Sequence, residues 1–323
     1  MLKFHNGLNS PVVLTCTRTF SRAQAGPKQS HSPRSALIPK PANFDEMLDI
    51  TNTRLFQSRL SRPDRNLALR ERREKELLGR KNPIIIEGKK LVPMLPLGSA
   101  GRSQLFQLIN KTQTKEELAK VEPVIRAMMI QHRRSVGVSH LKLFLSKSAQ
   151  YGRLSDASEF LFSSQVLQSF WTDKTLLKEL IRIHIIHGSL TGKLLRQYRR
   201  LITTQDKNAL DISLLMAAGL KSFVEPKEAT PEEVVKERAS VFNEFVAKAR
   251  QIINSTEISE ESLRHLTPID LALAEPILEL VKENDKIEQI KTIVNRKHVD
   301  VTGYIERIKS GVATKSEQIH NAE

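Results

Sequence analysis

Apolar residues recur along most of this chain at the three- and four-residue spacing of amphipathic helices. The pattern is nearly continuous from Ser103 onward, where strand signals are almost absent. It predicts helices over about 103–110, 114–129, 138–149, 155–168, 173–186, 191–202, 208–219, 231–253, 259–264, 268–284 and 285–296. We therefore expect an all-α fold.

The chain ahead of Ser103 has a more varied pattern. Partly helical spacing predicts a short helix over 43–57, and a densely charged helix is expected over 62–80. Residues 84–92 place apolar residues on both sides of a Glu-Gly-Lys-Lys sequence, which favours a small hairpin with a glycine-containing turn. Pro93 and Pro96 then favour an extended chain that lies along another macromolecule, or an ordinary interdomain linker.

Hydroxyl residues mark two of the expected helix starts. Ser103 is expected to cap the helix that runs to about Asn110. Thr114 and Glu117 have the spacing of a capping box, in which the threonine hydroxyl accepts from the third amide and the glutamate reaches back.

The first 44 residues hold six basic residues and no Asp or Glu. This composition is typical of a mitochondrial targeting segment, and the alternative is a disordered basic tail. Arg18–Ser21 resembles a matrix-protease cleavage pattern, so we expect the mature N-terminus between Ser21 and about Asn43. The predicted location is the mitochondrial matrix.

The net charge of +15 is spread unevenly along the chain. Residues 54–102 hold 13 basic and five acidic residues, and residues 103–224 hold 18 and nine. Residues 225–323 hold 14 basic and 19 acidic residues. A basic front and a mildly acidic end indicate that the front part meets a polyanion. Lipid head groups are less favoured, because no strong apolar face of Trp and Phe backs the basic stretches.

Two stretches of the helical part resemble each other. Gly152 and Gly188 lie 36 residues apart, and each follows an amphipathic helix. Each also precedes a hydroxyl residue, Ser155 or Thr191, that can cap the next helix. Each unit is expected to be a helical hairpin that buries its apolar face by stacking on a neighbour. A pair of unrelated, generic hairpins is the alternative.

The sequence Tyr-Gly-Arg-Leu-Ser-Asp-Ala-Ser-Glu-Phe at 151–160 resembles the turn and second helix of a pentatricopeptide repeat. The resemblance covers about 138–205, and it implies a solenoid of stacked helical hairpins and RNA binding in mitochondria. The second copy departs from the pattern, with Gly192-Lys193 where a small alanine is expected, and a third copy near Gly219 is irregular. Base-reading positions are therefore not carried over.

Catalytic and metal-binding patterns are not found. His184 and His187 share a helix face, but no acidic ligand is placed nearby, so core or solvated histidines are expected. The P-loop spacing does not occur, and Ser139-His140 has no orienting acid in register. The single cysteine, Cys16, lies in the expected presequence. We expect no enzyme, no metal site and no cofactor, and no apolar run is long enough for an integral membrane segment.

The expected RNA contacts are clusters of arginine and lysine. Arginine suits phosphate because its planar fork allows bidentate contact, and a tyrosine among arginines can stack a base. The predicted RNA-binding residues are Arg70, Arg72, Arg73, Arg80, Lys81, Lys89, Lys90, Arg133, Arg134, Arg196, Tyr198, Arg199 and Arg200. Any one of these clusters could instead be a solvated face.

Together these patterns predict a presequence and disordered segment at 1–43 and an extended basic N-terminal arm at 44–102. A domain of stacked, solenoid-like helical hairpins at 103–224, an acidic helical region at 225–300 and a tail at 301–323 are expected to follow. The favoured function is a non-catalytic structural component of the mitochondrial ribosome, with the small subunit preferred, that contacts ribosomal RNA and mitochondrial ribosomal proteins. One alternative is a pentatricopeptide-like factor for the maturation or translation of mitochondrial mRNA. The other is a helical assembly factor of the matrix or inner membrane that binds only proteins or lipids.

Overall fold

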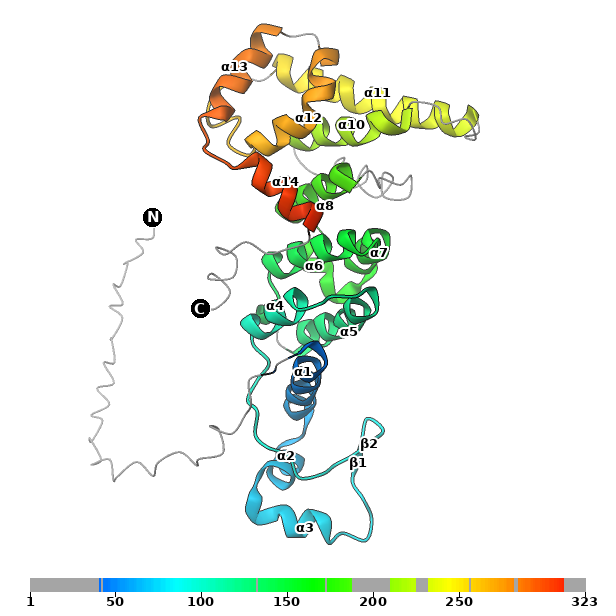
Figure 1. Cartoon of the computed structure of the whole chain (residues 1–323), viewed down its shortest axis with the longest axis vertical. Helices are drawn as coiled ribbons and strands as arrows, with labels where there is room; N and C mark the ends of the chain where they lie inside the picture. Colours follow the sequence, from blue (N-terminus) through cyan, green and yellow to red (C-terminus); the bar gives the residue numbers. More distant parts are fainter. Residues whose placement is uncertain are drawn as a thin grey trace, which may run out of the picture. The chain divides into compact units, whose positions relative to one another are not determined.

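The computed structural model describes residues 41, 43–131, 133–171, 173–187, 210–224, 232–255, 257–281 and 284–310. Most of these residues are helical, and the strands among them form a single two-stranded hairpin (Figure 1). The prediction of an all-α fold is confirmed. Residues 1–40, which include the predicted cleavage pattern, and the predicted helix at 191–202 lie outside the described residues.

The first large group of helices surrounds a common apolar core. Its elements are α1 (Phe44–Arg59), α4 (Arg102–Asn110), α5 (Lys115–Gln131), η3 (Arg133–Ser135), α6 (Val138–Gln150), α7 (Leu154–Ser163), η4 (Gln165–Phe170) and α8 (Lys174–His187). α1 packs against α4 and α5, and α6 contacts α4, α7 and α8. Phe144 and Leu105 of this group are among the largest fully buried side chains of the described residues.

The predicted charged helix at 62–80 is interrupted. The structure has α2 (Arg62–Leu69), a 3-10 turn η2 (Glu71–Arg73) and α3 (Glu74–Leu78), with Arg70 in an extended conformation. The physical reason is a competing hydrogen bond, because the Met94 amide donates to the Ala68 carbonyl at 2.8 Å. In an unbroken helix that carbonyl would accept from Arg72.

A hairpin follows α3, as the glycine-containing turn predicts. β1 (Ile85–Ile86) pairs antiparallel with β2 (Lys89–Lys90), so that Ile85 lies opposite Lys90. Glu87 and Gly88 have φ angles of 51° and 76°, and two central residues of positive φ are typical of the type I′ turn that joins twisted strands.

The remaining helices are α10 (Leu210–Val224), α11 (Glu232–Ser255), α12 (Pro268–Val281), α13 (Asn284–Asn295) and α14 (Val301–Ser310). α10 packs against α8, α11 and α12, and α14 contacts α6 and α8 (Figure 1). The predicted short helix at 259–264 is a turn, and the predicted tail also differs, since its first ten residues form α14. Tyr304 and Ile308 of α14 are buried in the main core.

One hydrophobic core contains residues from Phe44 to Ile308, and it therefore crosses the predicted boundaries at 102/103, 224/225 and 300/301. A second, smaller cluster consists of Leu60, Ala68, Leu77 and Leu91. It holds α2, α3 and the hairpin together. The main core supports the helical part, whereas residues 62–90 rest on few buried apolar side chains.

The turn between α6 and α7 forms as the repeat predicts, except for its cap. Gly152 has a φ of 67°, the Arg153 amide donates to the Ser148 carbonyl at 2.7 Å, and the Gly152 amide donates to Ala149. These bonds form a Schellman motif, which favours glycine at the left-handed position. The expectation that Ser155 caps α7 is wrong, because α7 begins at Leu154 without a side-chain cap. Gly188 lies outside the described residues, so the second hairpin stays a prediction.

The two other predicted caps differ in outcome. Thr114 Oγ1 accepts from the Glu117 amide at 3.2 Å, and the Glu117 carboxylate accepts from the Gln113 amide at 2.7 Å. The reciprocal bond therefore forms one residue earlier than the capping-box pattern predicts. α4 begins at Arg102, one residue before the expected start, and Gly101 precedes it without a side-chain cap.

Buried charged side chains join α8 to α10 and α12. The Asp270 carboxylate is fully buried and accepts from Lys178 Nζ and Arg182 Nε, each at 2.9 Å. Lys178 also pairs with Asp211 of α10 at 2.9 Å. Thr267 donates its amide to Asp270, also at 2.9 Å, and so links the start of α12 to the same carboxylate. We call Lys178, Arg182, Asp211 and Asp270 the buried charge cluster.

Candidate nucleic-acid interface

Residues 62–90, which we call the basic segment, are attached to the end of α1 by polar contacts. The buried Gln57 amide donates to the Leu95 carbonyl at 2.7 Å and accepts from the Leu97 amide at 3.1 Å. The Arg65 guanidinium donates to carbonyl oxygens at the end of α1, including Ser58 at 3.0 Å. The Arg65 bonds satisfy carbonyls that the end of α1 leaves unpaired, whereas the Gln57 bonds hold the extended chain that follows the basic segment. Both residues therefore have structural roles.

Four of the predicted RNA-binding residues present unpaired charge. Arg70, Arg72, Lys81 and Lys90 are exposed, and none forms an ion pair with a described residue. No carboxylate therefore neutralises these side chains within the described part of the chain. Such side chains are available to neutralise phosphates.

The other three predicted residues of the basic segment have local contacts. Arg80 pairs with Glu76 at 3.2 Å, and Arg73 lies 3.9 Å from the same carboxylate. Lys89 Nζ lies 5.9 Å from the centroid of the Phe56 ring, which favours a cation–π contact. All three are at the surface or half-buried, and exposed pairs of this kind are weak enough to exchange for a phosphate.

Exposed apolar side chains lie next to the basic ones. Leu78 and Ile85 each have 65% of their surface exposed, and Val92 and Leu95 are also exposed. These four residues were not predicted from the sequence to be part of a surface. An apolar residue in a charged stretch is ordinarily expected to be buried, and these four side chains are not part of the small cluster around Leu77. Such interleaving of apolar and basic side chains is a feature of surfaces that contact a partner.

The other predicted RNA-binding residues are described only in part. Arg134 is exposed, and its backbone carbonyl accepts from Arg102 Nε at 2.7 Å. The side chain of Arg133 and the whole of 196–200, with Arg196, Tyr198, Arg199 and Arg200, lie outside the described residues. Their contact with RNA stays a prediction.

Three histidines of the described residues, His140, His184 and His187, occupy structural positions, whereas His265 and His298 are exposed. His184 is buried in α8, 3.5 Å from Ser158 Oγ, and His187 Nε2 lies 3.4 Å from the Ile308 carbonyl. His140 is also buried; its Nδ1 accepts from the Gly137 amide at 3.1 Å, and Nε2 lies 3.0 Å from the Arg102 carbonyl. Burial lowers the pKa of His140, so the neutral ring caps α6. Within the described residues no three acidic, histidine or cysteine side chains gather as metal ligands.

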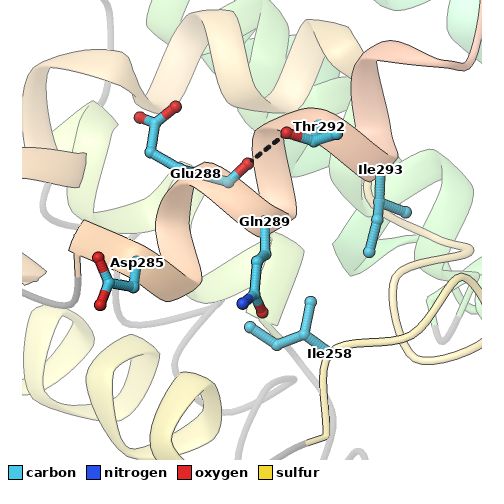
Figure 2. Close-up of a pocket in the computed structure, with 6 residues that line it drawn as sticks. All are labelled: Ile258, Asp285, Glu288, Gln289, Thr292 and Ile293. Carbon is cyan, nitrogen blue, oxygen red and sulfur yellow. Dashed lines mark hydrogen bonds between the residues drawn. The ribbon is translucent and has the colours of Figure 1, made fainter.

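Figure 2 shows a cavity of about 490 Å³ beside α13. Asp285, Glu288 and Gln289 line it from the helix, and Ile258 lines it from the facing loop. Thr292 does not offer its hydroxyl proton to a ligand, because that hydroxyl donates to the Glu288 carbonyl at 2.8 Å. Two carboxylates and no basic side chain in the lining make this cavity unsuitable for a polyanion.

The length and composition of the described helices show whether any of them could cross a membrane. None of them combines the length and the apolar character that crossing a membrane requires. The candidate interface is a basic surface segment with interleaved apolar side chains, attached to a helical core. Comparisons of the chain with models of protein families, with curated proteins and with solved structures gave no significant match.

Proposed function

We propose that this chain binds RNA through the basic segment and is a non-catalytic structural component of the mitochondrial ribosome, with the small subunit preferred. The observation that supports it best is the exposure of Arg70, Arg72, Lys81 and Lys90 without carboxylate partners in the described residues. Binding of such side chains to phosphate releases condensed counterions, so affinity is gained without sequence recognition. In this function the basic segment acts as an arm that lies along RNA.

The weak internal packing of the basic segment supports a permanent component of the ribosome over a factor that binds transiently. Residues 62–90 contribute Ala68 and Leu77 to the small cluster with Leu60 and Leu91, and Leu67 is their one other buried apolar residue. A segment with so little buried apolar surface gains stability when a permanent neighbour covers it. The exposed Leu78, Ile85, Val92 and Leu95 suit a neighbouring ribosomal protein.

The mitochondrial part of the proposal rests on the sequence of the first 44 residues, which is rich in basic residues and has no acid. Removal of such a presequence on import would leave the basic segment near the new N-terminus. The pentatricopeptide-like alternative has the α6–α7 hairpin in its favour, with its left-handed Gly152. The protein-only assembly factor is favoured by the same exposed apolar residues, if the basic residues prove to be a solvated face.

Binding to single-stranded RNA across a salt series tests the proposal. Replacing Arg70, Arg72, Lys81 and Lys90 together by glutamine should lower the salt slope by about three, at about 0.7 for each lost phosphate contact. The matched control replaces Arg264, Arg296, Lys236 and Lys309, which are also two arginines and two lysines and are also exposed. Both variants lose the same charge, so an equal effect of the two would show non-specific attraction and contradict an interface at the basic segment.

A further inference from the structure

A second cavity lies away from the basic segment. It has a volume of about 800 Å³ and is formed by the start of α1, the loop between α4 and α5, and the end of α6. Its lining is mainly polar and includes Lys147, Tyr151, Asn110, Thr112, Gln113 and Glu117. Ligand cavities in proteins have volumes of about 300–1,000 Å³, so this cavity is large enough for more than a simple ion.

Lys147 is the unusual residue of this cavity. Only 6% of its surface is exposed, and its ammonium group donates to one acceptor, the Thr112 carbonyl, at 3.2 Å. The Tyr151 hydroxyl donates to the same carbonyl at 2.9 Å. An ammonium group has three protons to donate, and no carboxylate among the described residues pairs with this one. Burial lowers the pKa of Lys147, which reflects the cost of keeping this charge without a counter-ion.

A carboxylate lines the same cavity. Glu117 Oε2 accepts from the Gln113 amide at 2.7 Å, and its other oxygen forms no hydrogen bond with a described residue. Burial, with a contribution from the Glu117 charge, raises the pKa of Tyr151, which places that carboxylate near the tyrosine. The lining also contains Lys111, whose ammonium donates to the Pro41 carbonyl at 3.1 Å, and Asp45, whose carboxylate pairs with Lys120 at 3.1 Å. Among the charged groups of the lining, Lys147 and Glu117 form no ion pair with a described residue, so the cavity offers the first to an anionic group and the second to a donor of the same ligand.

We infer that this cavity binds a nucleotide, with its phosphate on the Lys147 ammonium and a donor of its base on the Glu117 carboxylate. The volume is large enough for a free mononucleotide or for one unstacked nucleotide of a single-stranded RNA, and both have the same chemistry. The inference goes beyond the proposed function because no residue of the basic segment takes part. Adenine and cytosine present an exocyclic amino group to a carboxylate, whereas uracil does not, so AMP and CMP should bind more tightly than UMP.

A binding role and a structural role for Lys147 predict opposite effects on stability. If the lysine only holds the Thr112 carbonyl, Lys147→Met removes a hydrogen bond and lowers the melting temperature. If the charge is retained for a ligand, its removal relieves an uncompensated buried cation. The variant without ligand should then be at least as stable as the wild type, as is often found when a binding residue is replaced.

The experiment uses the full chain with AMP, CMP, UMP, adenosine, inorganic phosphate and a short single-stranded RNA as probes. Binding is measured by calorimetry and melting temperature for the wild type, Lys147→Met and the control Lys115→Met. Lys115 is an exposed lysine at the first residue of α5, so the control loses the same charge outside the cavity. We expect Lys147→Met to weaken AMP binding by about tenfold or more, which corresponds to the loss of one charge-assisted hydrogen bond. Glu117→Gln should reduce the preference for AMP over UMP.

The probes separate the sources of the nucleotide. Binding of AMP that depends on Lys147 supports a mononucleotide site, and Lys147-dependent binding of the RNA alone supports a site for an RNA nucleotide. The inference is overturned if no probe binds, if binding is the same in Lys147→Met and the wild type, or if adenosine binds as tightly as AMP. The glutamine variant of the basic segment should leave AMP binding unchanged, so failure here and failure of the proposed function are distinguishable.

Discussion

Asp270 is the residue whose replacement should most weaken the helical core. Its carboxylate is fully buried and is the common acceptor for Lys178 and Arg182 of α8 and for the Thr267 amide. Removing one partner of a buried ion pair costs about 3–5 kcal/mol, because the other charge stays buried without compensation. Lys178 would keep Asp211 at 2.9 Å, and the one carboxylate left to Arg182 among the described residues would be Glu179 at 3.4 Å, beside the Thr267 hydroxyl at 3.1 Å. We therefore expect Asp270→Ala to lower the free energy of unfolding by about 3 kcal/mol, the lower end of that range.

Denaturant unfolding followed by circular dichroism measures this loss. Asp285→Ala is the matched control, since Asp285 is an exposed aspartate in the first turn of α13. Its effect should stay within about 0.5 kcal/mol. The double variant Arg182→Met, Asp270→Leu removes one charge of each sign and leaves the Lys178–Asp211 pair, so it should be less destabilised than Asp270→Ala. The reasoning would be refuted if Asp270→Ala lowered the free energy of unfolding by less than about 1 kcal/mol. It would also be refuted if the loss in the double variant equalled the sum of the losses from its two single changes.

The Asp270 carboxylate also makes the stability of the fold depend on pH. Burial alone would raise the pKa of Asp270, but the charges of Arg182 and Lys178 outweigh burial and lower the pKa below its ordinary value. The unfolded chain therefore takes up the proton first as the pH falls below about 3.9. The stability that Asp270 contributes is complete above that pH and is lost progressively below it. The difference between wild type and Asp270→Asn should shrink accordingly in acid.

Three further predictions concern single residues of the helical part. Gly152→Val should lower the free energy of unfolding by about 1–2 kcal/mol through left-handed strain alone, because a Cβ at this position meets no atom within 4 Å and adds no clash. Gly101→Val should cost less, because the φ of Gly101 is negative, and equal losses in unfolding experiments would contradict this. Thr114→Ala should lower stability by about 0.5–2 kcal/mol through loss of the α5 cap, and an unchanged denaturation midpoint would exclude that role. Burial lowers the pKa of His140, so the unfolded chain binds a proton at this histidine first, and the free energy of unfolding should fall from pH 7 to pH 5. His140→Gln should flatten this dependence of stability on pH, and an unchanged dependence would contradict the neutral capping ring.

Elements with a local cause could be predicted from the sequence. The hairpin turn at Glu87-Gly88, the left-handed Gly152 and the Thr114 cap all depend on residues within a few positions of each other. The break of the charged helix at Arg70 could not be predicted, because the Met94 amide that takes the Ala68 carbonyl comes from 26 residues further on. The structure thus departs from local expectation where a distant segment supplies a better hydrogen-bond partner.

The α14 helix had a detectable signal that was not used. Val301, Tyr304, Ile305 and Ile308 have helical spacing, but the stretch is short and polar on its other side. The buried charge cluster had no local signal, since Lys178 and Asp270 lie 92 residues apart. The same holds for Lys147, whose position on α6 resembles that of an ordinary surface lysine until the Thr112 loop covers it.

Sedimentation of matrix extract through a gradient at high salt, with and without RNase, tests the proposed function most directly. A structural component of the ribosome should remain with the small subunit at high salt and move to the top of the gradient after RNase treatment. The full chain with Arg70, Arg72, Lys81 and Lys90 replaced by glutamine should leave the subunit at lower salt than the wild type, since each lost phosphate contact reduces the electrostatic part of binding. A protein found at the top of the gradient in both conditions, or in a heavy complex that RNase does not change, would contradict the account.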